Sequence, residues 1–266
     1  MKRPSTFLYS ALSFGFAFLY IPIFVLMAYS FNDSRLATVW GGFSTRWYSA
    51  LLDDEQILGA ALLSLEIAVI SATLATVLGT LAGLALNRMG RYRGRTLFTG
   101  MIAAPLVMPE VITGLSLLLL FVSLQELTGW PSSRGANTIT IAHITFSMAY
   151  VAVIVQSRLA SMDHALEEAA MDLGATRFRT FLRVTGPMLL PAIAASAMLI
   201  FPWSFDDFVI TYFVAGIGST TLPIYVFSQL RFGATPVINT IGTLFVVLTM
   251  AALALMYFVQ KKNESI

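Results

Sequence analysis

The sequence has no cysteine among its 266 residues, and charged residues make up only 11% of it. The absence of cysteine excludes a disulfide framework, a thiolate nucleophile and a cysteine metal site. Lysine occurs only near the two ends of the chain, at Lys2, Lys261 and Lys262. This distribution excludes a Walker-type phosphate-binding lysine from the interior. If ATP drives the protein, another chain must bind it.

Apolar residues are abundant instead. They form 57% of the sequence, and the mean hydropathy of +0.79 is far above that of a soluble domain. The basic N-terminal end precedes an apolar run longer than the roughly 7 to 15 residues of a cleaved signal, and no A-x-A-like cleavage site follows. We therefore expect an integral membrane protein whose first helix is retained.

The apolar residues gather in six stretches, each long enough for a spanning helix, which needs about 20 residues. These stretches are 7–31, 58–86, 97–124, 138–157, 188–214 and 238–259. We find no internal repeat and no low-complexity segment. The sequence therefore predicts one all-α membrane domain over residues 1–266.

The basic residues predict the orientation of this domain, because Lys and Arg accumulate in short cytoplasmic loops. If both termini are cytoplasmic, twelve of the 16 basic residues lie inside. The other four lie outside: Arg35, Arg46, Arg134 and Arg231. We therefore expect cytoplasmic termini and a cytoplasmic position for segment 161–187.

Segment 161–187 is predicted to form two short amphipathic helices joined at Gly174. Asp163 is placed to cap the first helix, on which apolar residues share one face and three acids lie towards the other. Gly174 suits an elbow because glycine tolerates positive φ. Thr176 can cap the second helix, which has an apolar and a basic face, and Pro187 is expected to end the inner segment before the fifth span. The apolar face predicts a protein partner.

A helix resting on the lipid surface is the alternative. The basic residues of the second helix favour it. The acidic cluster of the first helix opposes it, because the inner leaflet is negative.

The stretch EAAMDLGATRFRTFLRVTGP resembles the signature E-A-A-x-x-x-G-x(9)-I-x-L-P in the cytoplasmic loop of type I ABC importer permeases. Four residues match the first part: Glu168, Ala169, Ala170 and Gly174. Val184 stands for the isoleucine and Pro187 matches the final position, whereas Gly186 stands where leucine is expected. The resemblance implies the ABC transmembrane type-1 fold, with coupling helices between spans four and five.

The same resemblance implies a transport subunit in the inner membrane of a bacterium. Such a subunit is not an enzyme and binds no cofactor itself. Its implied partners are a second, different permease, two ATP-binding subunits that carry ATP and magnesium, and a periplasmic binding protein; nucleic acid is not among them. Glu168, Ala169, Ala170 and Gly174 would shape the contact with the ATPase. We add Arg177 to this contact on physical grounds.

Acidic residues inside the membrane predict a substrate path, because each costs about 2.5 to 3.5 kcal/mol to insert. Glu110 follows Pro109 in the third span, and Asp206 and Asp207 follow Pro202 in the fifth. Both prolines are expected to bend or break their helices and to open polar backbone. Each acid has an alternative role. Glu110 suits the first turn of a restarted helix, and the two aspartates suit a helix cap or an arginine of a partner subunit.

Aromatic residues surround the two aspartates. Trp203 and Tyr212 are the ones we assign to the path, since aromatic faces stabilise ammonium groups. Packing or interfacial anchoring is the alternative role for them. Acids beside aromatics favour a cationic substrate, and a linear diamine or polyamine would use two or more acids. No metal site is expected.

Two further stretches, SFDDFVITYF and TLPIYVFSQLRFGATPVINT, resemble permeases of the spermidine and putrescine uptake branch. This resemblance implies a polyamine substrate, with putrescine ahead of spermidine. Import of another small cation or solute is the alternative within the family.

Other readings compete with the permease. A secondary transporter would also place acids near broken helices, but the cytoplasmic elbow would then have no duty. An intramembrane serine hydrolase would use Ser116, after Gly114, with His143 on the next span. We expect Ser116 instead to bond its own helix and His143 to be a satisfied packing residue. For Glu66, in the second span, we expect an interhelical hydrogen bond.

Overall fold

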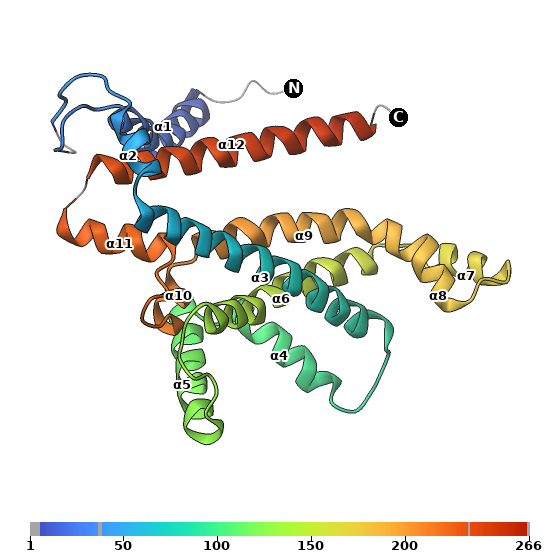
Figure 1. Cartoon of the computed structure of the whole chain (residues 1–266). Coiled ribbons are helices and arrows are strands. Elements are labelled where there is room, and N and C mark those ends of the chain that lie inside the picture. The colour runs from blue at the N-terminus through green and yellow to red at the C-terminus, as the bar shows by residue number, and fades with distance from the viewer. Residues whose placement is uncertain (1–5, 37–38, 234, 265–266) are drawn as a thin grey trace. The chain divides into compact units, whose positions relative to one another are not determined.

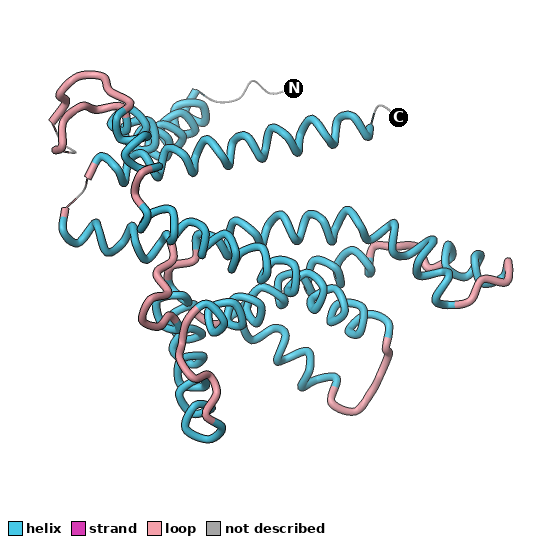
Figure 2. The backbone as a smooth tube through the Cα atoms, in the orientation of Figure 1, coloured by secondary structure: helices cyan, strands magenta, loops and turns pink. Residues whose placement is uncertain are grey.

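The computed structural model describes residues 6–36, 39–233 and 235–264. Within these ranges the chain is almost entirely helical, and the β pairing is confined to one isolated bridge between Asn32 and Phe43 (Figure 2). Lys2 and Arg3, which we counted as cytoplasmic, lie outside the described residues. The expected all-α class is confirmed.

The helices follow one another along the chain as labelled in Figure 1. Their bounds are α1 Thr6–Ser30, α2 Arg46–Leu52, α3 Glu55–Arg88, α4 Arg95–Val107, α5 Glu110–Thr128, α6 Ala136–Ala160, α7 Ala165–Asp172, α8 Arg177–Thr180, the π segment η1 Phe181–Thr185, α9 Gly186–Asp206, α10 Val209–Val214, α11 Leu222–Phe232 and α12 Pro236–Glu264. In the described ranges, five helices are long and apolar enough to span a membrane: α1, α3, α5, α6 and the continuous run Arg177–Asp206.

The six expected spans map onto these helices in different ways. Three of them fall on α1, α3 and α6, with bounds that differ by a few residues. Stretch 97–124 is divided into α4 and α5, and stretch 188–214 into α9 and α10. Stretch 238–259 lies within α12, whose described apolar part is Pro236–Ala251. The number of six spans therefore stays a prediction.

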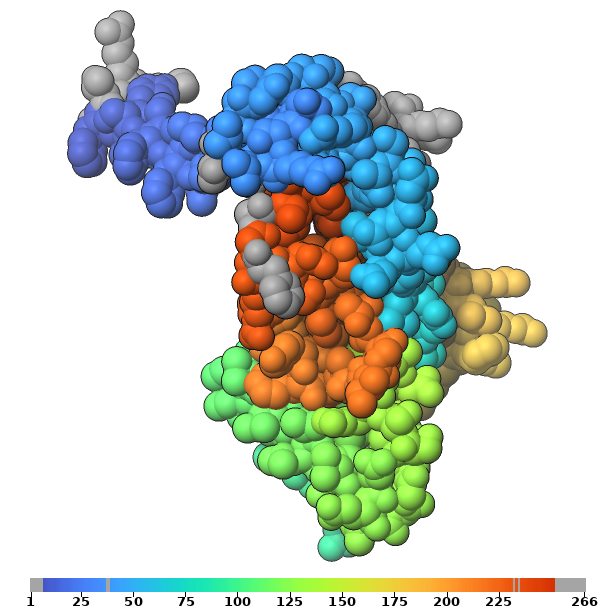
Figure 3. All heavy atoms as spheres, turned by 60° about the vertical axis from the view of Figure 1, so that its left-hand side comes forward, coloured from blue at the N-terminus to red at the C-terminus, as the bar shows by residue number. Residues whose placement is uncertain are grey.

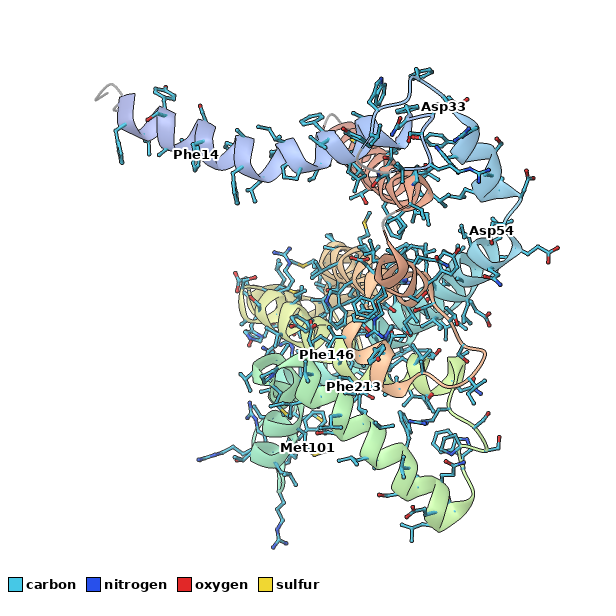
Figure 4. All side chains as sticks on the ribbon, turned by 90° about the vertical axis from the view of Figure 1, so that its left-hand side faces the viewer. Phe14, Asp33, Asp54, Met101, Phe146 and Phe213 are labelled. Carbon is cyan, nitrogen blue, oxygen red and sulfur yellow. The ribbon has the colours of Figure 1, made fainter. Side chains whose placement is uncertain are left out.

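The chain forms two compact units, of which the first comprises residues 1–59 and 225–266. In this unit α12 packs against α1 and α2. The Asn32 side chain closes the loop after α1 by donating to the Val39 carbonyl at 2.7 Å and accepting from the Gly41 amide at 2.7 Å. Phe14 on α1 points away from its helix (Figure 4) and is 73% exposed. Such side chains form an apolar surface suited to lipid.

The second unit, residues 60–224, holds the two candidate sites. Its core joins α3, α5, α6 and α10 through Ile67, Phe121, Phe146 and Ile210. Phe146 and Phe213 lie where the helices of this unit converge (Figure 4). Burial of large apolar side chains at one place fixes how the broken spans meet.

Two glycines let α3 and α6 approach closely. A Cβ added to Gly79 would lie 2.5 Å from the Cβ of Val151, and one added to Gly83 would lie 2.8 Å from the Ala152 carbonyl oxygen. The four-residue spacing of small side chains is a common feature of packed membrane helices. These positions leave no room for a side chain.

Replacing Gly79 by valine is therefore expected to destabilise the protein by about 1 to 3 kcal/mol, through overpacking against Val151. Thermal unfolding of the purified protein in detergent measures this loss. Gly100→Val is the matched control, because a Cβ at Gly100 meets nothing within 4 Å. Equal losses in both variants would show that close packing is not the cause.

Candidate functional site

The elbow of segment 161–187 is built around Gly174, as the sequence predicts. Gly174 has a φ of +84°, a conformation that few residues other than glycine adopt easily. Its amide donates to the Met171 carbonyl at 2.9 Å, and the Ala175 amide donates to the Ala170 carbonyl at 3.1 Å. These two bonds form a Schellman motif that ends α7. The motif turns the chain away from the helix axis.

The two helices of the elbow are capped, although one cap differs from the expectation. Thr176 caps α8, and its Oγ1 accepts from the Arg179 amide at 3.4 Å. The N-cap residue of α7 is His164 rather than Asp163. The Asp163 carboxylate still accepts from the Ala165 amide at 2.9 Å. Asp163 therefore satisfies the amide of the first residue of α7, although it lies one residue before the N-cap position.

The second helix of the elbow runs on past Pro187 into the fifth span, so Pro187 marks no break between the inner segment and that span. α8, the π segment Phe181–Thr185 and α9 run on without a break. Pro187 lies in the first turn of α9, where a missing amide hydrogen costs little. Gly186 lies where the π segment meets α9, and a Cβ added to it would lie 2.9 Å from the Phe181 carbonyl oxygen. The departure from leucine therefore makes room for the π segment.

The tip of the elbow presents apolar side chains to solvent. Leu173 is 90% exposed and Phe178 is 71% exposed. Figure 3 shows this part of the second unit, in yellow, projecting as a lobe. Of the predicted contact residues, Glu168, Ala169, Gly174 and Arg177 are exposed and Ala170 is half-buried. Their role in a contact stays a prediction.

An ion pair beneath the elbow was missed by the sequence reasoning. Arg88 Nη2 donates to Glu167 Oε1 at 2.6 Å, and Arg88 Nη1 donates to His164 Nδ1 at 2.8 Å. Thr185 Oγ1 donates to the same oxygen of Glu167 at 2.6 Å. In the sequence, the opposite charges of Arg88 at the end of α3 and Glu167 in α7 were the only indication of this ion pair. They lie 79 positions apart, so only the fold shows the pairing.

Three of the acids predicted to lie within the membrane, Glu110, Asp206 and Asp207, line one cavity of about 490 Å³. Its lining residues are Glu110, Leu199, Pro202, Trp203, Asp206, Asp207, Phe208 and Val209. Four of the five predicted path residues are among them. Tyr212 is not, because it lies exposed on α10, in contact with Phe208 at 5.4 Å between ring centroids.

Glu110 reaches the cavity because the third span breaks beside it. A residue before proline is driven to extended backbone, and Met108 accordingly has a φ of −81° and a ψ of 136°. Pro109 then serves as the N-cap residue of α5, and Glu110 is its first residue. An acid suits this position, since the N-terminal end of a helix carries partial positive charge. The alternative role for Glu110 thus coexists with its place in the cavity.

The fifth span breaks at Asp207 rather than at Pro202. α9 continues through Pro202 to Asp206, and Asp207 has an extended ψ of 120°. Asp207 Oδ2 accepts from the Thr211 amide and from Thr211 Oγ1, both at 2.8 Å. The carboxylate thereby replaces lost backbone bonds at the start of α10. One of the two aspartates therefore caps the helix break, as the alternative proposed.

His143 completes this buried network across α6. Its Nε2 lies 3.1 Å from Asp207 Oδ2 and 2.9 Å from Thr211 Oγ1. Its Nδ1 lies 2.7 Å from Ser204 Oγ. The expectation of a satisfied packing histidine is confirmed. The serine beside it is Ser204 and not Ser116, so the proposed Ser116 and His143 pair does not form.

Trp203 has a packing role as well as a place in the cavity lining. Its ring stacks on Phe146 with centroids 4.3 Å apart and an interplanar angle of 17°. The stack fixes the indole against α6. A ring held in this way can face a bound cation at little further entropic cost.

Glu66 differs from its expectation. Its side chain is exposed on α3, and within the described residues it makes no hydrogen bond or ion pair. The same part of the chain contains no group of three or more His, Cys, Asp or Glu side chains arranged to hold a metal ion.

The chain matches one family model and several relatives. The model of the binding-protein-dependent transport system inner membrane component matches residues 75–264. The putrescine transport system permease protein PotI of Escherichia coli K12 is 56% identical over 230 residues, which cover 86% of this chain and 82% of PotI. The spermidine/putrescine permease PotC of the same strain is 40% identical, covering 88% of this chain and 86% of PotC.

Solved structures share the fold. A chain of a bacterial ABC transporter that imports the acidic polysaccharide alginate has a TM-score of 0.75 and 17% identity, over 97% of this chain and 95% of that one. A chain of the methionine ABC transporter MetNI has a TM-score of 0.60 and 17% identity, over 77% and 93%. The expected type-1 fold is confirmed. The chain belongs to the family of binding-protein-dependent transport system inner membrane components, as a permease of the type I ABC importer class.

Proposed function

We propose that this chain is the permease subunit of an ABC importer that moves a polyamine, putrescine in preference to spermidine, across the bacterial inner membrane. Transport proceeds by alternating access, and both termini lie in the cytoplasm. The cavity that joins Glu110, Asp206 and Trp203 supports this proposal. The 56% identity to a putrescine permease favours the same substrate.

The free acids of the cavity suit a linear dication. Asp207 is buried and bonded to His143 and Thr211, whereas Asp206 is exposed and Glu110 is half-buried. Two carboxylates from different helices therefore remain for substrate. A diamine carries one ammonium group at each end, so it can use both. Trp203 and Phe208 would cover its apolar middle.

The proposed partners follow from the elbow and from the family. A second, different permease would complete the path, and a periplasmic polyamine-binding protein would deliver substrate. Of two ATP-binding subunits, which carry ATP and magnesium, one would receive Leu173 and Phe178 at the elbow tip of this chain. Glu168, Ala169, Ala170, Gly174 and Arg177 would shape that contact. Exposed apolar side chains beside charges are typical of such a docking surface.

Competition for uptake tests the substrate. In cells that carry the complete transporter, unlabelled putrescine is expected to suppress uptake of labelled putrescine at the lowest concentration. Spermidine should follow, and amino acids and metal cations should have no effect. Suppression by an amino acid or a metal ion at equal concentration would reject the polyamine assignment. Uptake in cells that lack this chain is the control.

A further inference from the structure

We propose that Arg88 and Glu167 are positioning residues that form the joint through which helix α7 moves two membrane-spanning helices. Neither residue belongs to the signature that shapes the ATPase contact. The inference rests on the proposed function, since it assigns a mechanical role beneath the docking surface.

The joint gathers three elements on one atom. Glu167 Oε1, on α7, accepts from Arg88 at 2.6 Å and from Thr185 at 2.6 Å. Arg88 is the last residue of α3, and Thr185 is the last residue of the π segment that continues into α9. Helix α7 is therefore bonded to the cytoplasmic ends of the second and fifth spans.

A second bond fixes the orientation of α7. The other terminal nitrogen of Arg88 donates to His164 Nδ1 at 2.8 Å, at the N-terminal end of α7. The guanidinium thus holds α7 at two points, His164 and Glu167. Two-point attachment resists rotation as well as separation, so α3 and α7 must move together.

Burial makes these contacts stronger than those of an ordinary surface pair. The side chains of Arg88 and Glu167 are 27% and 16% exposed, and Thr185 is buried. A charge pair that is partly withdrawn from water is screened less than an exposed one. Asp172, another acid of α7, is exposed, and within the described residues its side chain makes no hydrogen bond or ion pair.

The π segment is a suitable place for a movable connection. Short π segments inside α-helices often occur at functional sites, because their backbone bonding differs from that of the helix around them. Thr185 lies at the end of Phe181–Thr185 and is held by Glu167. A displacement of α7 therefore acts on the fifth span at this segment.

Loss of the joint should separate ATP hydrolysis from import. The elbow tip, with Gly174 and Leu173, would still seat on the ATPase, because it lies outside the ion pair. Movement of α7 would no longer pass fully to α3 and α9. ATP would be hydrolysed without opening the path.

The test uses the complete transporter in proteoliposomes, with its binding protein and labelled putrescine. Glu167→Gln is expected to raise the ATP hydrolysed per putrescine imported about tenfold, since a charge-assisted bond favours the joined arrangement by at least such a factor. Asp172→Asn is the matched control and should leave the ratio unchanged. The ATP-binding subunit should co-purify in both. Arg88→Glu with Glu167→Arg should recover part of the coupling.

Thr185→Val gives a second test, because it removes one bond and keeps the ion pair; a smaller rise in the ratio is expected. An unchanged ratio in both Glu167→Gln and Thr185→Val would overturn the joint, as would a parallel fall of hydrolysis and import. Uptake and ATP hydrolysis by the wild-type transporter distinguish a failure of the joint from a failure of the proposed function. If putrescine neither enters nor stimulates hydrolysis in the wild type, the substrate is wrong, and the ratio is measured with the imported solute.

Discussion

Replacing Gly174 by valine is expected to abolish uptake while the protein still inserts into the membrane. The space around Gly174 is open, since an added Cβ meets nothing within 4 Å. The obstacle is the backbone, because a φ of +84° is unfavourable for a β-branched residue. The Schellman bonds to Ala170 and Met171 would then be lost, and the tip would leave its docking position.

Two further substitutions at Gly174 make this experiment specific. Asparagine tolerates the left-handed region, so Gly174→Asn should keep most of the uptake. Gly174→Ala should fall between asparagine and valine, because alanine carries a Cβ but no branch. Membrane content, uptake and co-purification of the ATP-binding subunit are measured for each. Normal uptake by the valine variant would reject the coupling role of the elbow.

The elbow was predictable because its signals are local. The bonds at Gly174 and Thr176 involve backbone groups within four residues of each, so the local sequence is enough to predict the turn and the cap. The apolar stretches likewise identified α1, α3 and α6, since spanning length and hydropathy belong to single segments. Pro109 marked a break for the same reason, as it acts on the residue just before it.

The internal contacts were not predictable in the same way. The bond between His143 and Asp207 joins residues 64 positions apart, and its formation depends on how α6 packs against α9 and α10. Pro202 suggested a break in the fifth span, but α9 continues through it. A proline within a helix removes one backbone hydrogen bond and bends the helix. A full break also leaves backbone amides at the start of the next helix without acceptors, and a side chain must then accept from them. Asp207 provides that replacement.

This difference between the adjacent aspartates leads to opposite expectations for Asp206→Asn and Asp207→Asn. Asp206 is exposed at the cavity, and within the described residues its carboxylate makes no hydrogen bond. Removing its charge should raise the KM for putrescine about tenfold or more, since a charge-assisted bond contributes about 1.5 to 3 kcal/mol. The unfolding temperature should not change, because no internal bond is lost.

Asp207→Asn should instead lower stability and the maximal uptake rate. Asp207 is only 8% exposed, and its Oδ2 serves the Thr211 amide, Thr211 Oγ1 and His143. An amide oxygen is a weaker acceptor than a carboxylate, so a loss of about 1 to 3 kcal/mol in the free energy of unfolding is expected. Weaker bonds at the break between α9 and α10 would also disturb the geometry of the cavity wall.

Uptake kinetics in proteoliposomes and thermal unfolding in detergent distinguish the two variants. The expected result is a higher KM at unchanged stability for Asp206→Asn, and lower stability with a lower maximal rate for Asp207→Asn. His143→Gln should resemble Asp207→Asn, because both weaken the same buried network. If both aspartate variants raised the KM equally and neither lost stability, Asp207 would have to leave its internal bonds and bind the cation. The network would then be a substrate site rather than the cap of a broken helix.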